Sequence, residues 1–181
     1  MINLSLVRIR AYGIPAPQGS KKHIGKGVLL ESSKRVKPWR EEVLRATLDS
    51  STYSGQIVSK ACSLYLEFLI PRPKSHFGTG RNRGRLKPSA PQYCTSNRNG
   101  DLDKLCRSTI DGLSVTSGGV LIEDDSLVVQ ITSSKRYCLD KELAGALIVL
   151  NYPTIFPIST NLENYVKRRW RETPKHLSVV R

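Results

Sequence analysis

Four stretches of the chain carry apolar side chains in the arrangement typical of β-strands, either alternating with polar residues or in short β-branched runs. They span residues 3–12, 57–70, 127–137 and 143–152. Only the short segment from Cys138 to Glu142 separates the last two stretches, which favours a β-hairpin there. The sequence therefore predicts four principal strands.

Two other stretches repeat apolar residues at helical spacing. The first covers about residues 38–50 and begins with Pro38, which suits the first turn of a helix. The second runs from Asp101 to about Val115, and its apolar face comprises Leu102, Leu105, Cys106, Thr109, Ile110 and Leu113. This order of elements predicts an α/β (α+β) fold, a small mixed β-sheet packed with two main helices.

Long polar segments lie between and after these elements. Residues 13–37 predict a loop with a short hairpin through Val28 to Leu30. Residues 71–100 form a second polar loop, and loops of this length are usually functional or disordered. A basic C-terminal extension, residues 153–181, contains a predicted helix from Asn161 to Glu172. The sequence leaves four roles open for this extension: a packing element with a solvated face, a dimer contact, an additional DNA contact or a mobile tail.

Composition places the chain among globular proteins. Its 181 residues are 39% hydrophobic and 24% charged, a balance that argues against wholesale disorder. We expect an intracellular protein without membrane association, because the sequence has no apolar run of membrane-spanning length and no signal-peptide pattern. The four cysteines lack the spacing of a zinc site and are expected to be free thiols.

Positive charge dominates the chain but is unevenly distributed. The formal net charge of +14 favours binding to a polyanion such as nucleic acid. Residues 101–125 are the exception, because six acidic residues against Lys104 and Arg107 leave a local net charge of −4. Divalent cations would let this cluster face phosphates. A solvated acidic helix face, remote from the binding surface, is the alternative that charge alone leaves open.

Two groups of carboxylates in this cluster have the spacing of a cation site. Asp101 and Asp103 begin the second predicted helix, and Glu123, Asp124 and Asp125 precede the third strand. Carboxylate oxygens select Mg²⁺ or Mn²⁺ over zinc. Asp101 also occupies the position of a helix N-cap, a role that needs no catalytic purpose.

The sequence around these carboxylates resembles the RusA family of Holliday-junction resolvases, especially its phage and prophage members. The resemblance rests on DLDKLCRSTIDGL followed by VLIEDDSLVV, with further likeness in GIPAPQGSKK and in the PRPKSH and KPSAP segments. It is strongest over residues 99–137 and extends over about residues 5–152. It implies that residues 1–152 form a RusA-like nuclease domain, with residues 153–181 as an extension outside the family pattern.

The resemblance also implies roles for individual residues. Asp101, Asp103 and Asp125 match the carboxylates that bind the catalytic Mg²⁺, for which Mn²⁺ can substitute, and Asp124 matches the acid beside them. Arg107 stands where some members have a functional Lys. A guanidinium keeps that charge but does not donate a proton at neutral pH, so we expect Arg107 to act electrostatically toward the phosphate or transition state.

Asp111 matches another recurrent position of the family. It also lies four residues after Arg107, and a surface ion pair at this helical spacing explains it at least as well. The sequence leaves both interpretations open.

For the whole chain, the resemblance implies a crossover junction endodeoxyribonuclease, a phosphodiester hydrolase of DNA recombination and repair. Such an enzyme resolves four-way junctions by paired symmetric nicks, and the near two-fold symmetry of the junction favours a homodimer with two active sites. The resemblance to phage members further implies a phage- or prophage-encoded protein in the cytoplasm of a bacterial host.

Basic residues of the two polar loops are the candidate DNA contacts, and we expect them to read the backbone rather than the bases. The candidates are Lys21, Lys22, Arg81, Arg83, Arg85 and Lys87, together with Lys104. Two other functions stay open: a metal-dependent nuclease of other branched DNA, and a non-catalytic basic DNA-binding protein. An RNA-binding role is disfavoured, because the aromatic residues, 7% of the chain, show no pattern of base-stacking side chains.

Overall fold

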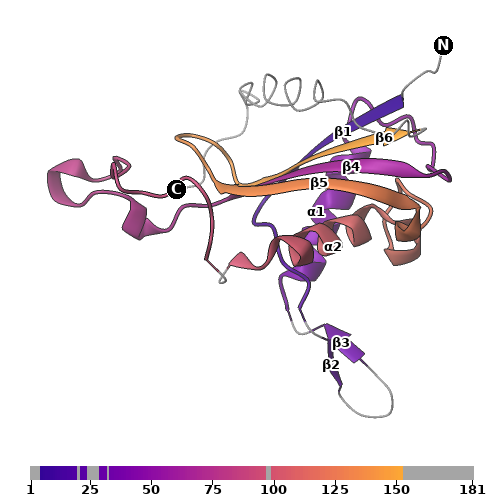
Figure 1. Ribbon diagram of the computed structural model, residues 1–181, viewed down its shortest axis with the longest axis horizontal. Helices are drawn as coiled ribbons and strands as arrows, with labels where there is room; N and C mark the ends of the chain where they lie inside the picture. The colour runs from indigo at the N-terminus through magenta and orange to yellow at the C-terminus, as the bar shows by residue number, and fades with distance from the viewer. Residues whose placement is uncertain (1–4, 20, 24–28, 32, 97–98, 153–181) are drawn as a thin grey trace.

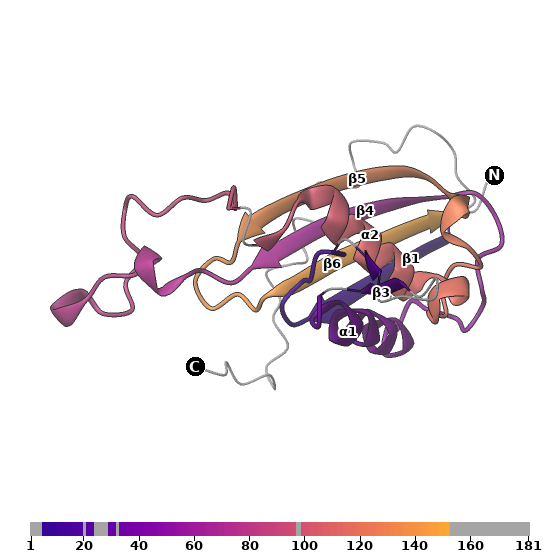
Figure 2. The ribbon, with the colours of Figure 1, turned by 90° about the horizontal axis from the view of Figure 1, so that it is seen from below.

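A mixed four-stranded sheet with two helices on one face forms the body of the protein (Figures 1 and 2). The structure is a computed structural model that describes residues 5–19, 21–23, 29–31, 33–96 and 99–152. The principal elements are β1 (Ser5–Tyr12), α1 (Val36–Leu48), β4 (Cys62–Ile70), α2 (Leu102–Leu113), β5 (Val128–Tyr137) and β6 (Gly145–Tyr152). The predicted α+β class, with a small mixed sheet and two main helices, is confirmed.

The strands lie in the order β1-β6-β4-β5, and this order corrects the predicted hairpin between β5 and β6. β4 lies between these two strands: Tyr65 of β4 is opposite Thr132 in a parallel pair with β5 and opposite Val149 in an antiparallel pair with β6. The burial of the strands explains the arrangement. β4 and β6 are largely buried on both faces, as central strands are, whereas β5 has repeated exposed positions and suits an edge.

The parallel pair of β4 and β5 requires a crossover, because the chain must return to the starting end of the sheet before β5 begins. α2 makes this return across the face of the sheet (Figure 2). It therefore runs opposite to β5, with its first residues near the end of β5 and its last residues near the beginning of that strand.

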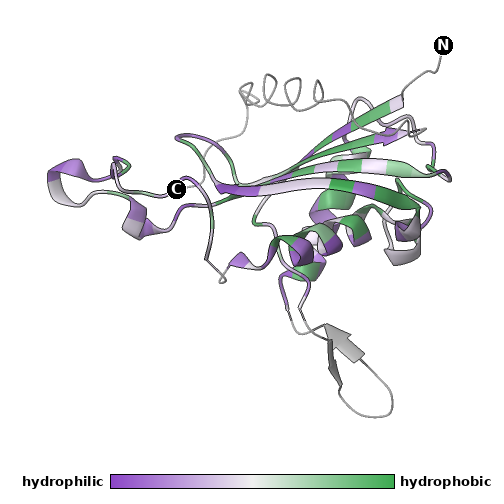
Figure 3. Cartoon of the chain, in the orientation of Figure 1, coloured by the Kyte–Doolittle hydropathy of each residue, from purple (hydrophilic) through white to green (hydrophobic). Residues whose placement is uncertain are grey.

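The main core fills the space between the sheet and the two helices. Ile9, Leu64 and Ile148 face it from the sheet, and each is at most 1% exposed. The helices approach closely at Gly112, where a Cβ atom would lie 3.1 Å from the Cβ of Val43 in α1. A polar contact also joins the helices, because the indole N–H of Trp39 donates to Thr109 Oγ1 at 3.0 Å. Figure 3 shows the apolar residues gathered along this layer.

Residues 114–127 connect α2 to β5 and are anchored in the core. Leu121 and Ile122 are fully buried, and the backbone N–H of Val58 donates to the carbonyl of Leu121 at 2.8 Å. The N–H of Glu123 donates in turn to the carbonyl of Val58 at 3.0 Å. These contacts fix the segment that leads to Asp125, which lies shortly before the first residue of β5.

Two basic projections extend from the body (Figure 1). One is a ribbon of β2 (Lys21–His23) paired antiparallel with β3 (Leu29–Glu31), which confirms the predicted hairpin. The other, residues 73–92, we call the arm; it contains two 3₁₀ turns, η1 (Lys74–His76) and η2 (Gly80–Asn82). Backbone hydrogen bonds hold its two sides together, with the N–H of Lys87 donating to the carbonyl of His76 at 2.9 Å.

All four cysteines are buried free thiols, as predicted. Among the described helices, none has the length and apolar character needed to cross a bilayer. The predicted helix at residues 161–172 and the rest of the extension, residues 153–181, lie outside the described residues.

Candidate functional site

The N-terminus of α2 begins at Asp101, which occupies the predicted N-cap position. Its side chain does not cap the helix; its carboxylate accepts a hydrogen bond from Lys104 Nζ at 2.8 Å. This contact lowers the pKa of Asp101 and raises the pKa of Lys104. Lys104, predicted to contact DNA, is therefore held by Asp101.

Segments leading to both projections are anchored beside this helix end. The N–H of Gln18, just ahead of the β2–β3 ribbon, donates to the carbonyl of Lys104 at 3.0 Å. The chain returning from the arm reaches Gly100, whose carbonyl accepts from Lys135 Nζ at 2.7 Å. Gly100 also lies so close to Pro17 that any side chain there would collide with the ring. The first turn of α2 thus lies between the bases of the two basic projections.

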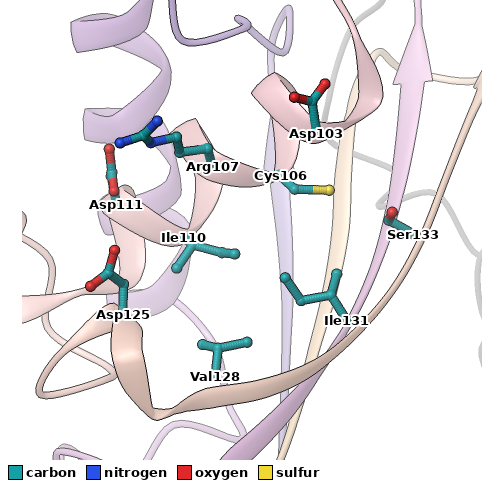
Figure 4. Close-up of a pocket in the computed structure, with 9 residues that line it drawn as sticks. All are labelled: Asp103, Cys106, Arg107, Ile110, Asp111, Asp125, Val128, Ile131 and Ser133. Atoms are coloured by element: carbon teal, nitrogen blue, oxygen red, sulfur yellow. The ribbon is translucent and has the colours of Figure 1, made fainter.

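A pocket of about 370 Å³ lies between α2 and the first half of β5. Its lining residues are Asp103, Cys106, Arg107, Ile110, Asp111, Asp125, Val128, Ile131 and Ser133 (Figure 4). The structure therefore brings three of the predicted site residues, Asp103, Arg107 and Asp125, to one pocket. Asp101 and Asp124 do not line it.

The two predicted carboxylate groups stand at different ends of this pocket. Asp125 lies on the side of Asp111, at the end of α2, whereas Asp103 lies toward the start of the helix (Figure 4). The eight-residue step from Asp103 to Asp111 corresponds to about 12 Å at 1.5 Å per residue. Within the described part of one chain, no three His, Cys, Asp or Glu side chains converge as metal ligands.

Asp124 shapes the segment before β5 rather than the pocket. It is the N-cap of the 3₁₀ turn η5 (Asp125–Leu127), where its carboxylate accepts from the N–H of Ser126 at 2.9 Å. It also accepts from Thr116 Oγ1 at 3.2 Å. The hydrogen bonds from Ser126 are the main reason that the pKa of Asp124 is lowered. Asp124 thereby orients its neighbour Asp125.

Asp111 forms an ion pair with Arg40 of α1 and is nearly buried. Of the two interpretations of Asp111 that the sequence left open, the surface pair with Arg107 is not observed, because α1 packs against α2 and Arg40 pairs with Asp111 instead. Arg107 is exposed and has no ion pair among the described residues. Its guanidinium lines the pocket and is available to a phosphate.

The carboxylates of the pocket differ in how the protein balances their charge. Arg40 neutralises Asp111, and outside the pocket Lys104 neutralises Asp101. Neither Asp103 nor Asp125 has an ion pair with any described residue. These two exposed carboxylates are the unbalanced negative charges of the pocket, and a bound cation would supply the missing charge.

The donor set fits a hard cation. Cys106 is 6% exposed, and burial raises the pKa of its thiol, which disfavours the thiolate that zinc prefers as a ligand. The remaining acidic donors are carboxylate oxygens, and Mg²⁺ in proteins often uses one or two carboxylates together with water and substrate phosphate. Asp103 and Asp125 are carboxylates of the kind that Mg²⁺ prefers, and each lies at its own end of the pocket.

Apart from Lys104 in α2, the predicted DNA-binding residues are carried by the two projections. Arg81, Arg83, Arg85 and Lys87 are exposed on the arm, and Lys21 and Lys22 lie in β2. Arg72 fixes the base of the arm: its Nε donates to the carbonyl of Cys138 at 2.7 Å, and its guanidinium lies 5.4 Å from the centre of the Tyr137 ring. The arm is thus anchored to the sheet at its base.

Sequence reasoning did not find Arg40, Lys135 or Ser133. Arg40 meets Asp111 across 71 positions of sequence, and Lys135 reaches Gly100 from the edge strand. Ser133 lines the pocket and hydrogen-bonds to the thiol of Cys106. The only signal for Ser133 and Lys135 was their alternation within the predicted strand, and Arg40 had no signal at all.

The fold and pocket define a basic α+β protein with exposed carboxylates and a guanidinium gathered beside α2. A comparison with protein families gives a match to the family described as Endodeoxyribonuclease RusA, over residues 13–144. The chain belongs to this RusA endodeoxyribonuclease family. No curated protein matches the chain.

Replacing Arg40 with Met should lower the free energy of unfolding by about 2 kcal/mol. This is less than the 3–5 kcal/mol expected for a fully buried pair, because the Arg40 side chain is 28% exposed. Adding Asp111→Asn should restore part of the loss, since no unpaired charge then remains. Urea denaturation measures both variants, with Lys37→Met, at an exposed α1 position, as the control. An Arg40→Met chain as stable as the wild type would contradict the positioning of Asp111 by Arg40.

Proposed function

We propose that the protein is a Mg²⁺-dependent endodeoxyribonuclease that resolves four-way DNA junctions by paired symmetric nicks, in DNA recombination and repair. One observation carries this proposal: in a RusA family member, the pocket between α2 and β5 is lined by two carboxylates, Asp103 and Asp125, that have no ion pair with any described residue. A basic surface gathers DNA, and a cation at Asp103 or Asp125 would reconcile these carboxylates with a phosphate.

Asp101, Asp103 and Asp125 are the residues that we assign to Mg²⁺. Asp101 and Asp103 begin α2, where a single cation can reach both carboxylates, although Asp101 must then leave Lys104. When bound, the metal would activate water and stabilise charge on the phosphate oxygens. Mn²⁺ has the same preference for oxygen ligands and is the expected substitute.

Arg107 is the residue that we assign to the scissile phosphate. It is exposed, lines the pocket and has no carboxylate partner among the described residues. A guanidinium offers two parallel N–H donors to phosphate oxygens and stays charged at neutral pH. Arg107 would therefore bind the phosphate and stabilise developing charge, without transferring a proton.

A homodimer accounts for both the symmetry of the substrate and the separation of the carboxylates. Two copies related by a two-fold axis match a four-way junction and nick opposed strands. Because Asp103 and Asp125 lie at different ends of the pocket, we further propose that each active site combines Asp103 of one copy with Asp125 of the other. The arm and the β2–β3 ribbon would then hold the junction branches through phosphate contacts.

Cleavage of a labelled four-way junction with Mg²⁺ tests the function directly. We expect paired symmetric nicks from the wild type, and a loss of more than about 100-fold in rate for Asp103→Asn with binding retained. Removal of metal by EDTA should abolish cleavage, and added Mg²⁺ should restore it.

Linear duplex and flap substrates are the controls for specificity. Faster cleavage of flaps would assign the protein to other branched DNA. An intact junction with both proteins, despite tight binding, would leave a non-catalytic DNA-binding protein and contradict the proposal.

Mixing two inactive variants tests the shared active site. If Asp103 and Asp125 act from different copies, a heterodimer of Asp103→Asn and Asp125→Asn chains contains one intact site and one doubly altered site. Nicking of one strand should therefore return when the two proteins are refolded together, while each alone stays inactive. Activity that stays absent in verified heterodimers would place both carboxylates in a site formed by one chain.

Charge reversal of Lys21 and Lys22 tests whether the β2–β3 ribbon binds DNA. The double variant should weaken junction binding and reduce the slope of log K against log salt by about 0.9 for each phosphate that the ribbon no longer neutralises. Lys60→Glu, at an exposed position away from both projections, is the matched control. The measurement is fluorescence anisotropy over a salt series, and an unchanged slope would remove the ribbon from the binding surface.

A further inference from the structure

The face of the sheet that points away from α1 and α2, here called the outer face, is buried. Tyr65, Leu69 and Val149 lie on it and are 6%, 0% and 1% exposed, and with Cys138 they form a cluster separate from the main core. Tyr65 and Val149 are direct cross-strand partners on β4 and β6. The middle of the outer face is therefore shielded from water, whereas Leu6, Arg8, Arg10 and Leu147 beside it are part-buried.

No described helix covers the outer face. α1 and α2 both lie on the opposite side of the sheet (Figure 1). A row of polar residues crosses the outer face at one end: Ser63 pairs with Gln130 of β5 and Asn151 of β6. The side-chain oxygens of all three are buried without a hydrogen-bond partner among the described residues. Buried apolar groups and buried acceptors together require a further layer that offers apolar side chains and donors.

The sequence that follows β6 has the pattern such a layer needs. Between Asn161 and Glu172, apolar residues recur at helical spacing: Leu162, Tyr165, Val166 and Trp170. Arg169 falls on the same side of the pattern and is its one charged residue. The opposite side of the same helical pattern carries Lys167, Arg168 and Arg171. A helix of this length measures about 18 Å, and an eight-residue strand about 26 Å, so the segment fits on the sheet.

The point at which the chain leaves β6 also favours residues 153–181 as the layer that covers the outer face. β6 ends at Tyr152, one residue after Asn151 of the polar row, so residues 153–181 begin at the edge of the outer face. A second copy of the chain is a poorer occupant, because a two-fold contact between outer faces would bring Arg8 and Arg10 of both copies together. The apolar cluster likewise offers little to the phosphates of DNA.

We propose that residues 153–181 pack on the outer face of their own chain as a third layer. The apolar side of the helix at residues 161–172 lies against Tyr65 and Val149, and its basic side faces the solvent. The family match ends at residue 144, so this layer is an addition to the part of the chain that the family pattern covers. It gives the protein a second basic surface, on the side of the sheet opposite the candidate active site.

Tryptophan fluorescence of the full chain tests the proposal. The chain has two tryptophans, and Trp39 is 2% exposed in the main core. Any tryptophan emission that acrylamide quenches readily would therefore come from Trp170. We expect blue-shifted emission and an acrylamide quenching constant several-fold below that of the denatured chain, at every protein concentration. A Trp170→Phe chain assigns the signal.

Substitutions on the two partners sharpen the test. Tyr65→Glu on the outer face and Leu162→Asp in the segment should each expose Trp170 to the quencher, whereas Arg168→Gln on the polar side should not. Leu162→Asp leaves the sheet unaltered, so it stays informative if Tyr65→Glu fails to fold. The proposal is overturned if Trp170 is accessible in the wild type, if shielding is lost on dilution, which assigns the face to a second copy, or if shielding appears only with added DNA.

Discussion

The parallel pairing of β4 with β5 is the constraint on which the rest of the structure depends. A parallel pair cannot be closed by a tight turn, so the chain between the two strands must cross the sheet. That crossover contains the arm, α2 and the connector that ends at Asp125. Its direction places Asp103 beside the bases of both projections and Asp125 at the far end of α2. The separation of the carboxylates is thus a consequence of strand order.

The carboxylates near α2 fall into two kinds. Some are held by ion pairs or hydrogen bonds within the fold, and others have no ion pair and can bind a ligand. Arg40 holds Asp111 against α1, and backbone and hydroxyl donors hold Asp124 at the start of η5. Asp103 and Asp125 have no such ion pair among the described residues, and Arg107 faces the same pocket. The net positive charge of the chain therefore coexists with a local group of carboxylates that have no ion pair.

Local patterns in the sequence predicted most of the fold, because strands and helices leave a periodic trace of apolar residues. Both helices and all four principal strands lie close to their predicted positions. Pairing was harder: the proximity of β5 and β6 in sequence favoured a hairpin, but burial on both faces put β4 between them. The carboxylates of the pocket were found through a motif, whereas Arg40 was missed since its contact with Asp111 depends on helix packing alone.

The anchoring of the arm has a further consequence for how such a protein can diverge. Arg72 and Tyr137 fix the arm at its base, and His76 stacks edge-on against Tyr137 with ring centres 4.7 Å apart. Beyond the contacts of Arg72 and His76 with Tyr137, the arm is exposed and is held by its own backbone hydrogen bonds. Insertions or deletions at its tip would leave the core and pocket undisturbed. Evolution can therefore change the reach of the arm independently of the pocket beside α2.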